Sequence, residues 1–236
     1  MDLNALATDY DRDGYITGVP LFSENEANQH RKSLEDLEAS QGAIHYKAKL
    51  HTVMTSPLAM AMQPRVLDVV EALIGPDILL YDSTFIIKEP HTPGFVSWHQ
   101  DLTFWGLSDD AQVSMWLALT PATDLSGCMR MIPGSHKHGV YDHKTGNRGD
   151  NVLFQGQTVD GINEDEAVLC PLQPGEASFH HGWTLHASMP NRSDDRRIGL
   201  NVQYLAPHVR QTKHDHDSAM LVRGEDRSVS YTHLTL

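Results

Sequence analysis

The stretch Ile78–Ile87, with the sequence ILLYDSTFII, decides the fold because it is apolar and rich in residues that favour β-strands. Further runs of the same character follow: Val113–Leu119, Met129–Ile132, Ala177–His180 and Ile198–Leu205. The runs are separated by turn-forming pairs: Pro93-Gly94, Pro133-Gly134, Gly146-Asn147 and Pro174-Gly175. Many short strands divided by turns predict a mainly β fold, a sandwich or barrel of the jelly-roll kind.

Helices are predicted on the N-terminal side of these strands. Ser23 is a suitable N-cap for a polar, amphipathic helix over Asn25–Ala39. The segment Pro57–Ile74 has apolar residues at helical spacing, and Pro64 divides it into a short turn and a packed helix. The segment Asp9–Pro20 predicts a turn and a short strand.

The chain of 236 residues suits a single domain. We expect this domain to consist of an N-terminal helical part, a jelly-roll core and a C-terminal tail: residues 1–76, 77–210 and 211–236. The polar segment Gly139–Asp165 predicts a loop near an opening, with a lid as one possible role. The last residues, Ser228–Leu236, predict either a short edge strand or a tail that is not native to the fold.

Composition restricts the partners and the location. The formal net charge of −13 makes nucleic acid and anionic membranes unfavourable partners. No apolar run approaches the roughly 18 residues of a transmembrane helix. The acidic N-terminus lacks the pattern of a signal peptide, and two cysteines do not make a disulfide framework. We therefore expect a cytoplasmic protein.

The segment Ser97–Leu102, SWHQDL, carries the first half of a metal-binding pattern. His99 and Asp101 are two residues apart, so on a strand their side chains share one face. No other His-x-Asp occurs in the chain, although it contains 15 histidines. One imidazole, one carboxylate and a second histidine make the facial triad of non-haem iron(II) oxygenases, which leaves coordination positions open.

The segment Gly182–Arg197, GWTLHASMPNRSDDRR, carries the second half. It contains His186, and Arg197 follows eleven residues later at the start of a predicted strand. The planar fork of arginine suits bidentate capture of a carboxylate, and Ser188 lies on the strand face of His186. Arg196 is the alternative anchor, because strand alternation lets one of the two arginines face inward.

Together these motifs resemble those of the phytanoyl-CoA dioxygenase family, which also contains ectoine hydroxylase-like enzymes and some halogenases. The matching pieces are WHQD at Trp98–Asp101, Trp116, SGCMRMIPGSHK at Ser126–Lys137, PGE at Pro174–Glu176, and LHAS, PNRS and RR within Leu185–Arg197. The resemblance covers about residues 10 to 210.

The resemblance implies a double-stranded β-helix, which is a cupin-like jelly roll flanked by N-terminal helices. It implies that iron(II) is bound by His99, Asp101 and His186. It implies that Arg197 and Ser188 bind the tail of the co-substrate 2-oxoglutarate, with Lys88 as a second contact. Gln100 and Trp116 match positions that line the co-substrate pocket. Halogenating relatives have a small residue in place of Asp101, so hydroxylation is favoured here.

The implied activity uses Fe(II), 2-oxoglutarate and O2 to hydroxylate an unactivated C–H bond of a small, polar metabolite, releasing succinate and CO2. One alternative is a degenerate, metal-binding jelly roll that acts as a sensor or scaffold. Another is an acyl-CoA hydroxylase, although no basic patch of the size that coenzyme A requires is present. A zinc or cupin-type isomerase is disfavoured, since it needs no carboxylate anchor such as Arg197.

Several neighbouring residues have two interpretations. Arg130 suits either an anionic substrate or a salt bridge. Three aromatic residues suit either the substrate pocket or the core: Phe104, Trp105 and Trp183. Three histidines near the motifs are not expected to be ligands: His136, His180 and His181.

Overall fold

The protein, described by a computed structural model over residues 1–146, 149–153 and 155–234, is built on a seven-stranded sheet. The strand order is β1-β9-β4-β11-β2-β12-β13. In that order the strands span Tyr15–Pro20, Glu176–His181, Gln112–Ala118, Arg197–Leu205, Ile78–Lys88, Ser218–Arg223 and Thr232–His233. Neighbours are antiparallel, except that β12 and β13 are parallel.

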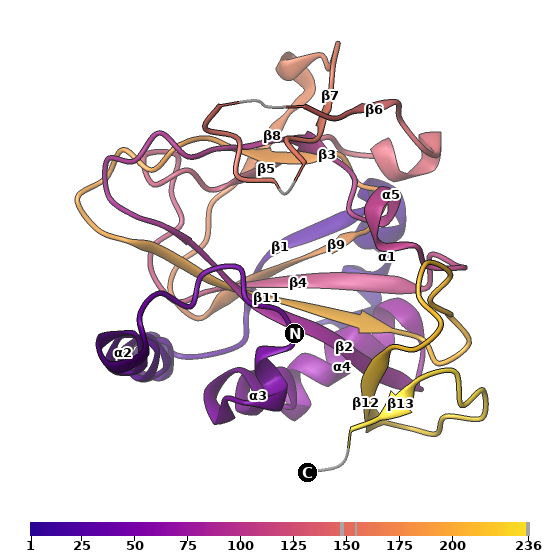
Figure 1. The fold of residues 1–236 in the computed structure, drawn as a ribbon. Helices are drawn as coiled ribbons and strands as arrows, with labels where there is room; N and C mark the ends of the chain where they lie inside the picture. Colours follow the sequence, from indigo (N-terminus) through magenta and orange to yellow (C-terminus); the bar gives the residue numbers. More distant parts are fainter. Residues whose placement is uncertain (147–148, 154, 235–236) are drawn as a thin grey trace.

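A second sheet, of four strands, lies over one face of the first (Figure 1). Its order is β3-β10-β5-β8, and the strands span Val96–His99, His186–Ser188, Met129–Met131 and Val168–Cys170. A strand pair beyond it consists of β6 and β7, at His143–Lys144 and Thr158–Val159. Two antiparallel sheets packed face to face confirm the predicted jelly roll.

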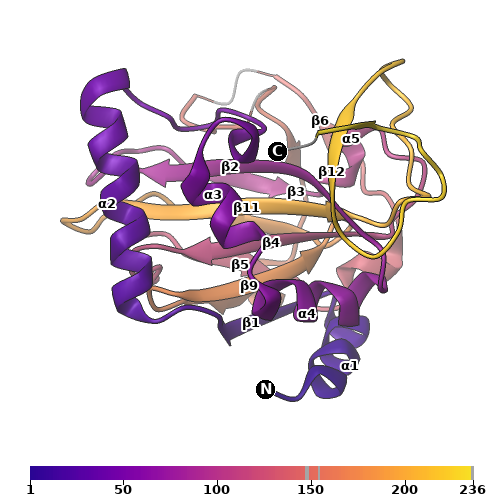
Figure 2. The same cartoon turned by 90° about the horizontal axis from the view of Figure 1, so that it is seen from below.

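Helices from the N-terminal part of the chain, residues 3–74, cover the other face of the large sheet. The α-helices are α1 to α5, at Leu3–Asp13, Glu24–Gln41, Thr55–Ala61, Pro64–Ile74 and Leu102–Trp105. Short 3-10 helices are η1 to η3, at Leu50–Thr52, Ser135–His138 and Glu164–Glu166. Seen from below, α3 and α4 lie across the sheet and α2 runs along its side (Figure 2). None of the described helices has the length and apolar character needed to cross a membrane.

The alternation along β11 separates the core from the interior space between the sheets. Leu200 and Val202 are fully buried in the same apolar core as Val66 and Val70 of α4. The alternate residues of β11, among them Arg197, Asn201 and Gln203, face the second sheet. Strand β4 is buried along its whole length, because helices cover one of its faces and the small sheet covers the other.

The predicted N-terminal helices are present, with one addition. Helix α2 begins at the predicted cap, where Ser23 and Glu26 form a reciprocal capping box. The segment predicted as a turn before β1 is instead part of helix α1. Asp2 accepts hydrogen bonds from the first helical amides, and Gly14, with φ of 81°, ends the helix. The sequence signal was weak because α1 has one buried residue, Tyr10.

The C-terminal segment is not the separate tail that we predicted. Strand β12 pairs with β2 in the large sheet, and β13, within Ser228–Leu236, pairs with β12. Met220 and Tyr231 are buried in this region. The divisions expected at residues 76 and 210 therefore do not match the arrangement, because β1 and β12 belong to the same sheet.

Candidate metal and co-substrate site

Three predicted ligands meet between the two sheets. His99 ends β3, and His186 begins β10 directly opposite it, so their rings lie 4.1 Å apart between centroids. Asp101 Oδ1 lies 3.4 Å from His99 Nε2 and 3.8 Å from His186 Nε2. One donor atom from each residue lies within 4.8 Å of the others, which is a spacing that can hold one metal ion.

The route by which Asp101 reaches the triad differs from the prediction. We expected His99 and Asp101 on one strand face, but β3 ends at His99 and Asp101 has helical dihedral angles, φ −60° and ψ −49°. Its position just before α5 turns the chain sharply and brings its carboxylate to the two imidazoles. The side chains of His99 and Asp101 therefore converge because of this turn, and not because they share a strand face.

Backbone carbonyls orient both imidazoles in the same way. His99 Nδ1 lies 2.9 Å from the Ser97 carbonyl, and His186 Nδ1 lies 3.0 Å from the Thr184 carbonyl. A carbonyl accepts, so Nδ1 carries the proton and Nε2 presents a lone pair toward Asp101. Burial and the neighbouring imidazoles hold the pKa of His186 well below its usual range, which keeps it neutral and able to bind a metal.

The carboxylate of Asp101 is ionised and held by two further residues. Burial alone would raise its pKa, but the histidines around it hold the pKa well below the usual value. Its second oxygen, Oδ2, accepts hydrogen bonds from Ser114 Oγ at 3.2 Å and from His180 Nε2 at 3.3 Å. His180 therefore contacts the candidate site, and its exclusion from the metal ligands stays a prediction.

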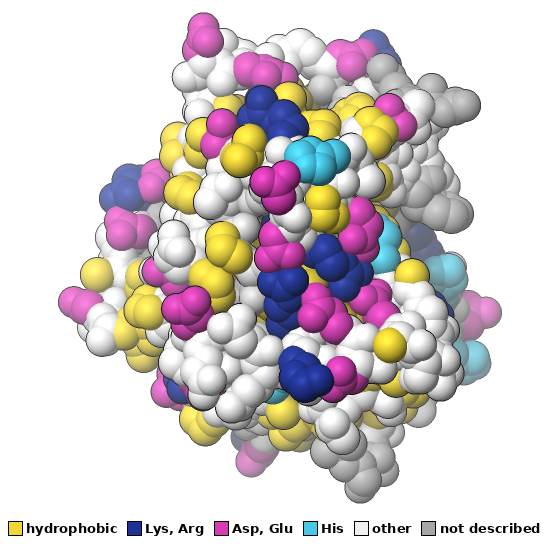
Figure 3. Space-filling model, turned by 90° about the vertical axis from the view of Figure 1, so that its left-hand side faces the viewer, with side chains coloured by type: hydrophobic (Ala, Val, Ile, Leu, Met, Phe, Trp, Pro, Cys, Tyr) yellow, Lys and Arg dark blue, Asp and Glu magenta, His cyan; other side chains and the backbone are white. Residues whose placement is uncertain are grey.

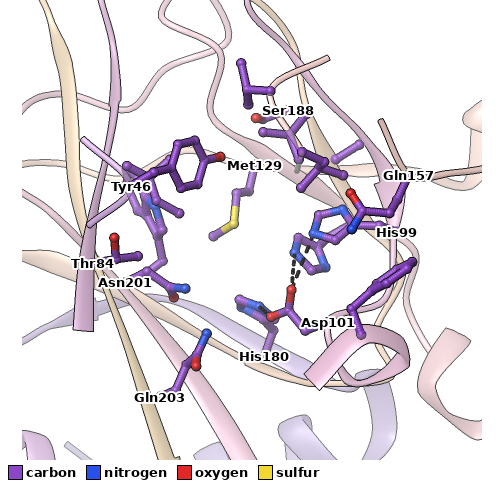
Figure 4. A pocket seen from close by; sticks show the side chains of 18 of the residues that line it. Tyr46, Thr84, His99, Asp101, Met129, Gln157, His180, Ser188, Asn201 and Gln203 are labelled. Atoms are coloured by element: carbon purple, nitrogen blue, oxygen red, sulfur yellow. Dashed lines mark hydrogen bonds and ion pairs between the residues drawn. The ribbon is translucent and has the colours of Figure 1, made fainter. Parts of the chain in front are cut away.

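The triad faces a cavity of about 520 Å³ between the sheets (Figure 4). Arg197 reaches this cavity from the first residue of β11 and is almost completely buried. Its Nη1 donates to the Gly127 carbonyl at 2.7 Å, and its guanidinium lies over the ring of Trp116. Within the described residues no carboxylate forms an ion pair with Arg197, and burial lowers its pKa to about 10.

Lys88 stands directly opposite Arg197, on β2. Its Nζ donates to Ser188 Oγ at 2.7 Å and to the carbonyls of Ser188 and Met189. Burial, followed by the charge of Arg197, lowers the pKa of Lys88 to about 6. Lys88 thus lies behind Ser188 and holds it in place, while Ser188 and Arg197 line the cavity. A buried guanidinium beside a serine hydroxyl, with no acidic partner among the described residues, forms a site for an anion.

The model of the phytanoyl-CoA dioxygenase family matches residues 10–199. The chain belongs to this family. The probable alpha-ketoglutarate-dependent hypophosphite dioxygenase of Stutzerimonas stutzeri is 29% identical over 150 residues, covering 63% of this chain and 52% of that protein. The phytanoyl-CoA dioxygenase domain-containing protein 1 of Danio rerio is 36% identical over 129 residues, covering 53% and 43%. The chain thus spans about half the length of the curated relatives it matches.

Solved structures support the same assignment. The apo form of the non-heme monooxygenase ThoJ has a TM-score of 0.85 and 31% identity, covering 97% of this chain and 86% of that one. CytC3 with Fe(II) and alpha-ketoglutarate has a TM-score of 0.73 and 22% identity, covering 96% and 90%. The second likeness shows the jelly-roll fold alone.

Within this member of the phytanoyl-CoA dioxygenase family, Arg196 and Arg197 have different surroundings. Arg196 turns to the surface, where it contacts Glu89 at 2.8 Å and Glu38 at 2.9 Å. Basic and acidic side chains are interspersed on that face of the molecule (Figure 3). Of the two adjacent arginines, Arg197 is therefore the one that faces the cavity.

Gln100 does not line the cavity, so that prediction was wrong. Because its neighbours His99 and Asp101 face inward, Gln100 points the other way and is fully buried. Its Nε2 donates to the carbonyls of Gly139 and Trp183, and its Oε1 accepts from the Tyr141 amide. Gln100 therefore fixes the start of the loop at Gly139–Asp165.

Part of that loop, at Val152, Leu153 and Gln157, lines the cavity. Its residues 147, 148 and 154 lie outside the described part, and the lid stays a prediction.

Contacts distinguish between the two interpretations given above for Arg130 and for the three aromatic residues. Arg130 forms a salt bridge with Glu164 at 2.7 Å and lies over the Trp98 ring, so it does not face the cavity. Phe104 and Trp105 line the cavity, whereas Trp183 is not among its lining residues. His136 and His181 line a separate cavity beside α1 and α4.

Sequence reasoning missed other residues of the cavity wall. They are Tyr46, Thr84, Asn201 and Gln203. A signal for two of them was available, since Asn201 and Gln203 share the strand face of Arg197. Gly199 lies between Arg197 and Asn201 on this face, and a Cβ atom there would collide with the indole of Trp116.

Proposed function

We propose that this protein is an Fe(II)- and 2-oxoglutarate-dependent dioxygenase that hydroxylates an unactivated C–H bond of a small molecule. The observation that carries the proposal is the placement of two complementary sites in one cavity. A triad of two imidazoles and a carboxylate faces the same space as a buried guanidinium without an acidic partner among the described residues. A 2-oxo dicarboxylic acid could bind the metal through its 2-oxo acid end and Arg197 through its other carboxylate.

The donor set fits iron(II). Two imidazole nitrogens and one carboxylate oxygen match the facial triad, which leaves positions for a chelating 2-oxo acid and for O2. His99, Asp101 and His186 would hold the ion. Bound iron would supply O2 activation, with one oxygen atom entering the product alcohol and the other entering succinate as CO2 is released. The ionised Asp101 occupies the position that a halide would need, which favours hydroxylation.

The residues of the chain itself bind, orient and shield the reactants. Arg197 and Ser188 would hold the distal carboxylate of 2-oxoglutarate, with a charge-assisted hydrogen bond from the guanidinium, and Lys88 would support them through its contact with Ser188. Trp116 supports the plane of the guanidinium from below. Apolar walls exclude water, which strengthens these electrostatic interactions. A small-molecule substrate and a cytoplasmic location remain part of the proposal.

The alternatives are less well supported. A degenerate sensor or scaffold would have no need for an anion site aligned with the triad. An acyl-CoA hydroxylase would need basic groups for the coenzyme phosphates, and the described cavity residues include a single cation, Arg197. The relatives named phytanoyl-CoA dioxygenase keep this alternative open to test with an acyl-CoA.

Succinate formation tests the proposal. The purified protein, supplied with Fe(II), 2-oxoglutarate and O2, should release succinate slowly even without its substrate. Omission of iron or its replacement by Zn(II) should abolish the release, as should His186→Ala. Binding of Fe(II) without binding of 2-oxoglutarate and without any succinate would instead favour the sensor or scaffold. Absence of metal binding would contradict the proposal.

A further inference from the structure

The part of the cavity that remains for a substrate has a distinct chemical character. The triad is assigned to the metal, and Arg197 and Ser188 are assigned to the co-substrate. Of the lining residues that the structure describes, Asp101 and Arg197 carry a formal charge, and His180 donates to Asp101. No other Asp, Glu, Lys or Arg is among the described lining residues.

Most of this remaining wall is apolar. It includes Ile86, Val96, Phe104, Trp105, Met129 and Leu153. These side chains come from both sheets, from α5 and from the Gly139–Asp165 loop. The whole cavity measures about 520 Å³, and the part left beside the co-substrate, with such walls, would accept a small molecule by burying its hydrocarbon surface.

One wall offers neutral hydrogen-bonding groups without partners. Thr84 and Asn201 stand opposite each other on β2 and β11, and Gln203 follows on the same face. Thr84 Oγ1 and Asn201 Oδ1 are buried and have no hydrogen-bond partner among the described residues. A buried unpaired polar atom costs free energy, so these atoms suit a ligand hydroxyl or carbonyl group. Figure 4 shows the three residues on one side of the cavity, across from the triad.

A charged substrate would find no compensating group there. Arg130 is bound to Glu164, and Arg196 is bound to acidic residues at the surface. A second anion in the cavity would lose its hydration beside Asp101, and a cation would compete for a carboxylate that is assigned to the metal.

We infer that the substrate is an uncharged, mainly hydrocarbon molecule with one or a few hydroxyl or carbonyl groups, recognised by Thr84, Asn201 and Gln203. The inference rests on the proposed function, because that function assigns the two charged ends of the cavity. It departs from the sequence-based expectation of a small, polar metabolite.

Three probes that share a naphthylamine skeleton test this inference. They are neutral N-phenyl-1-naphthylamine, anionic 8-anilino-1-naphthalenesulfonate and cationic N-(1-naphthyl)ethylenediamine. The protein is first loaded with Co(II) and 2-oxoglutarate without oxygen, and loading is followed by visible absorption. The neutral probe should bind with one-to-one stoichiometry, and about tenfold or more tightly than either charged probe in a fluorescence displacement assay.

Two matched variants locate the binding. Val96→Arg places a cation in the cavity wall, so it should weaken binding of the neutral probe and strengthen binding of the anionic one. Val168→Arg makes the same change at an exposed position of β8 and should leave both affinities within about twofold of the wild type.

Tighter or equal binding of a charged probe overturns the inference, as does failure of the neutral probe to bind. An unchanged preference in Val96→Arg overturns it too. Failure of the proposed function would be visible separately, as absent Co(II) absorption or absent succinate release, whatever the probes do.

Discussion

His180 Nε2 lies 3.3 Å from Oδ2 of Asp101, on the carboxylate oxygen that faces away from the two ligand imidazoles. Ser114 Oγ reaches the same oxygen at 3.2 Å. Since a carboxylate accepts, both neighbours donate, and they leave Oδ1 as the oxygen nearest to His99 and His186. The arrangement favours binding of a metal through one oxygen of Asp101.

Removal of this donor should weaken metal binding. His180→Leu should lower Co(II) affinity by about 10- to 100-fold, because loss of a partner that orients a ligand typically has that effect. A titration followed by Co(II) absorption measures it. His181→Leu is the matched control, since His181 lies next in sequence and lines a different cavity. Unchanged cobalt affinity and spectrum in a folded His180→Leu protein would contradict this role.

The two adjacent arginines should differ in their effect on 2-oxoglutarate. Arg197→Ala should raise the KM for 2-oxoglutarate by about 30-fold or more, because truncation of a buried charge pair costs about 2 kcal/mol or more. Arg197→Lys should recover part of this loss, since lysine keeps the charge without the planar fork. Arg196→Ala should have little effect on the KM for 2-oxoglutarate. The reverse pattern would exchange the two assignments.

Binding of 2-oxoglutarate should depend on pH through Lys88. Burial and Arg197 lower the pKa of Lys88 to about 6, so the amine of the free protein is mostly neutral at neutral pH. A bound carboxylate favours the charged amine and raises its pKa, so binding takes up a proton. The affinity should therefore fall as pH rises above about 6. Calorimetry in buffers of different ionisation enthalpy measures the uptake.

Lys88→Met is the control for this pH dependence, because it keeps the length of the side chain without the titrating group. It should bind 2-oxoglutarate more weakly and with a smaller proton uptake. A proton uptake equal to that of the wild type would assign the effect to another group.

Asp101 should determine both metal binding and the type of reaction. Asp101→Ala or Asp101→Gly should abolish hydroxylation and succinate release, since the ligand set loses its carboxylate. The wild-type product should contain added oxygen and no chlorine, even in chloride-rich buffer. Mass spectrometry of the product tests this once a substrate is known. A variant with wild-type succinate release would show that Asp101 is not a ligand.

Gly199 should tolerate no side chain while Trp116 is present. A Cβ atom there collides with the six-membered ring of the indole, which supports Arg197. Gly199→Ala should lower the free energy of unfolding by about 1–3 kcal/mol and weaken 2-oxoglutarate binding. Chemical denaturation measures the first effect. Adding Trp116→Phe, which removes the colliding ring, should recover part of the stability; additive losses in the double variant would contradict the collision.

The sequence predicted the features that depend on local pattern. Strands such as Ile78–Lys88 and helix α2 were evident from composition and capping, and the ligand set followed from two short motifs. Contacts between distant segments were not predictable from spacing. His180 meets Asp101 across two sheets, and Lys88 gains its place from the register of β2 with β11. Helix α1 and strand β12 were missed because they bury few residues.

The site draws its parts from both sheets. Two of the proposed ligands, His99 and His186, stand on the small sheet, whereas Arg197 and Lys88 stand on the large one. The separation of the sheets therefore contributes to the distance between the proposed metal end and the proposed carboxylate anchor. Packing of the sheets keeps that separation nearly constant, so it favours one chain length of the 2-oxo acid. Oxaloacetate, one methylene shorter than 2-oxoglutarate, should therefore bind more weakly.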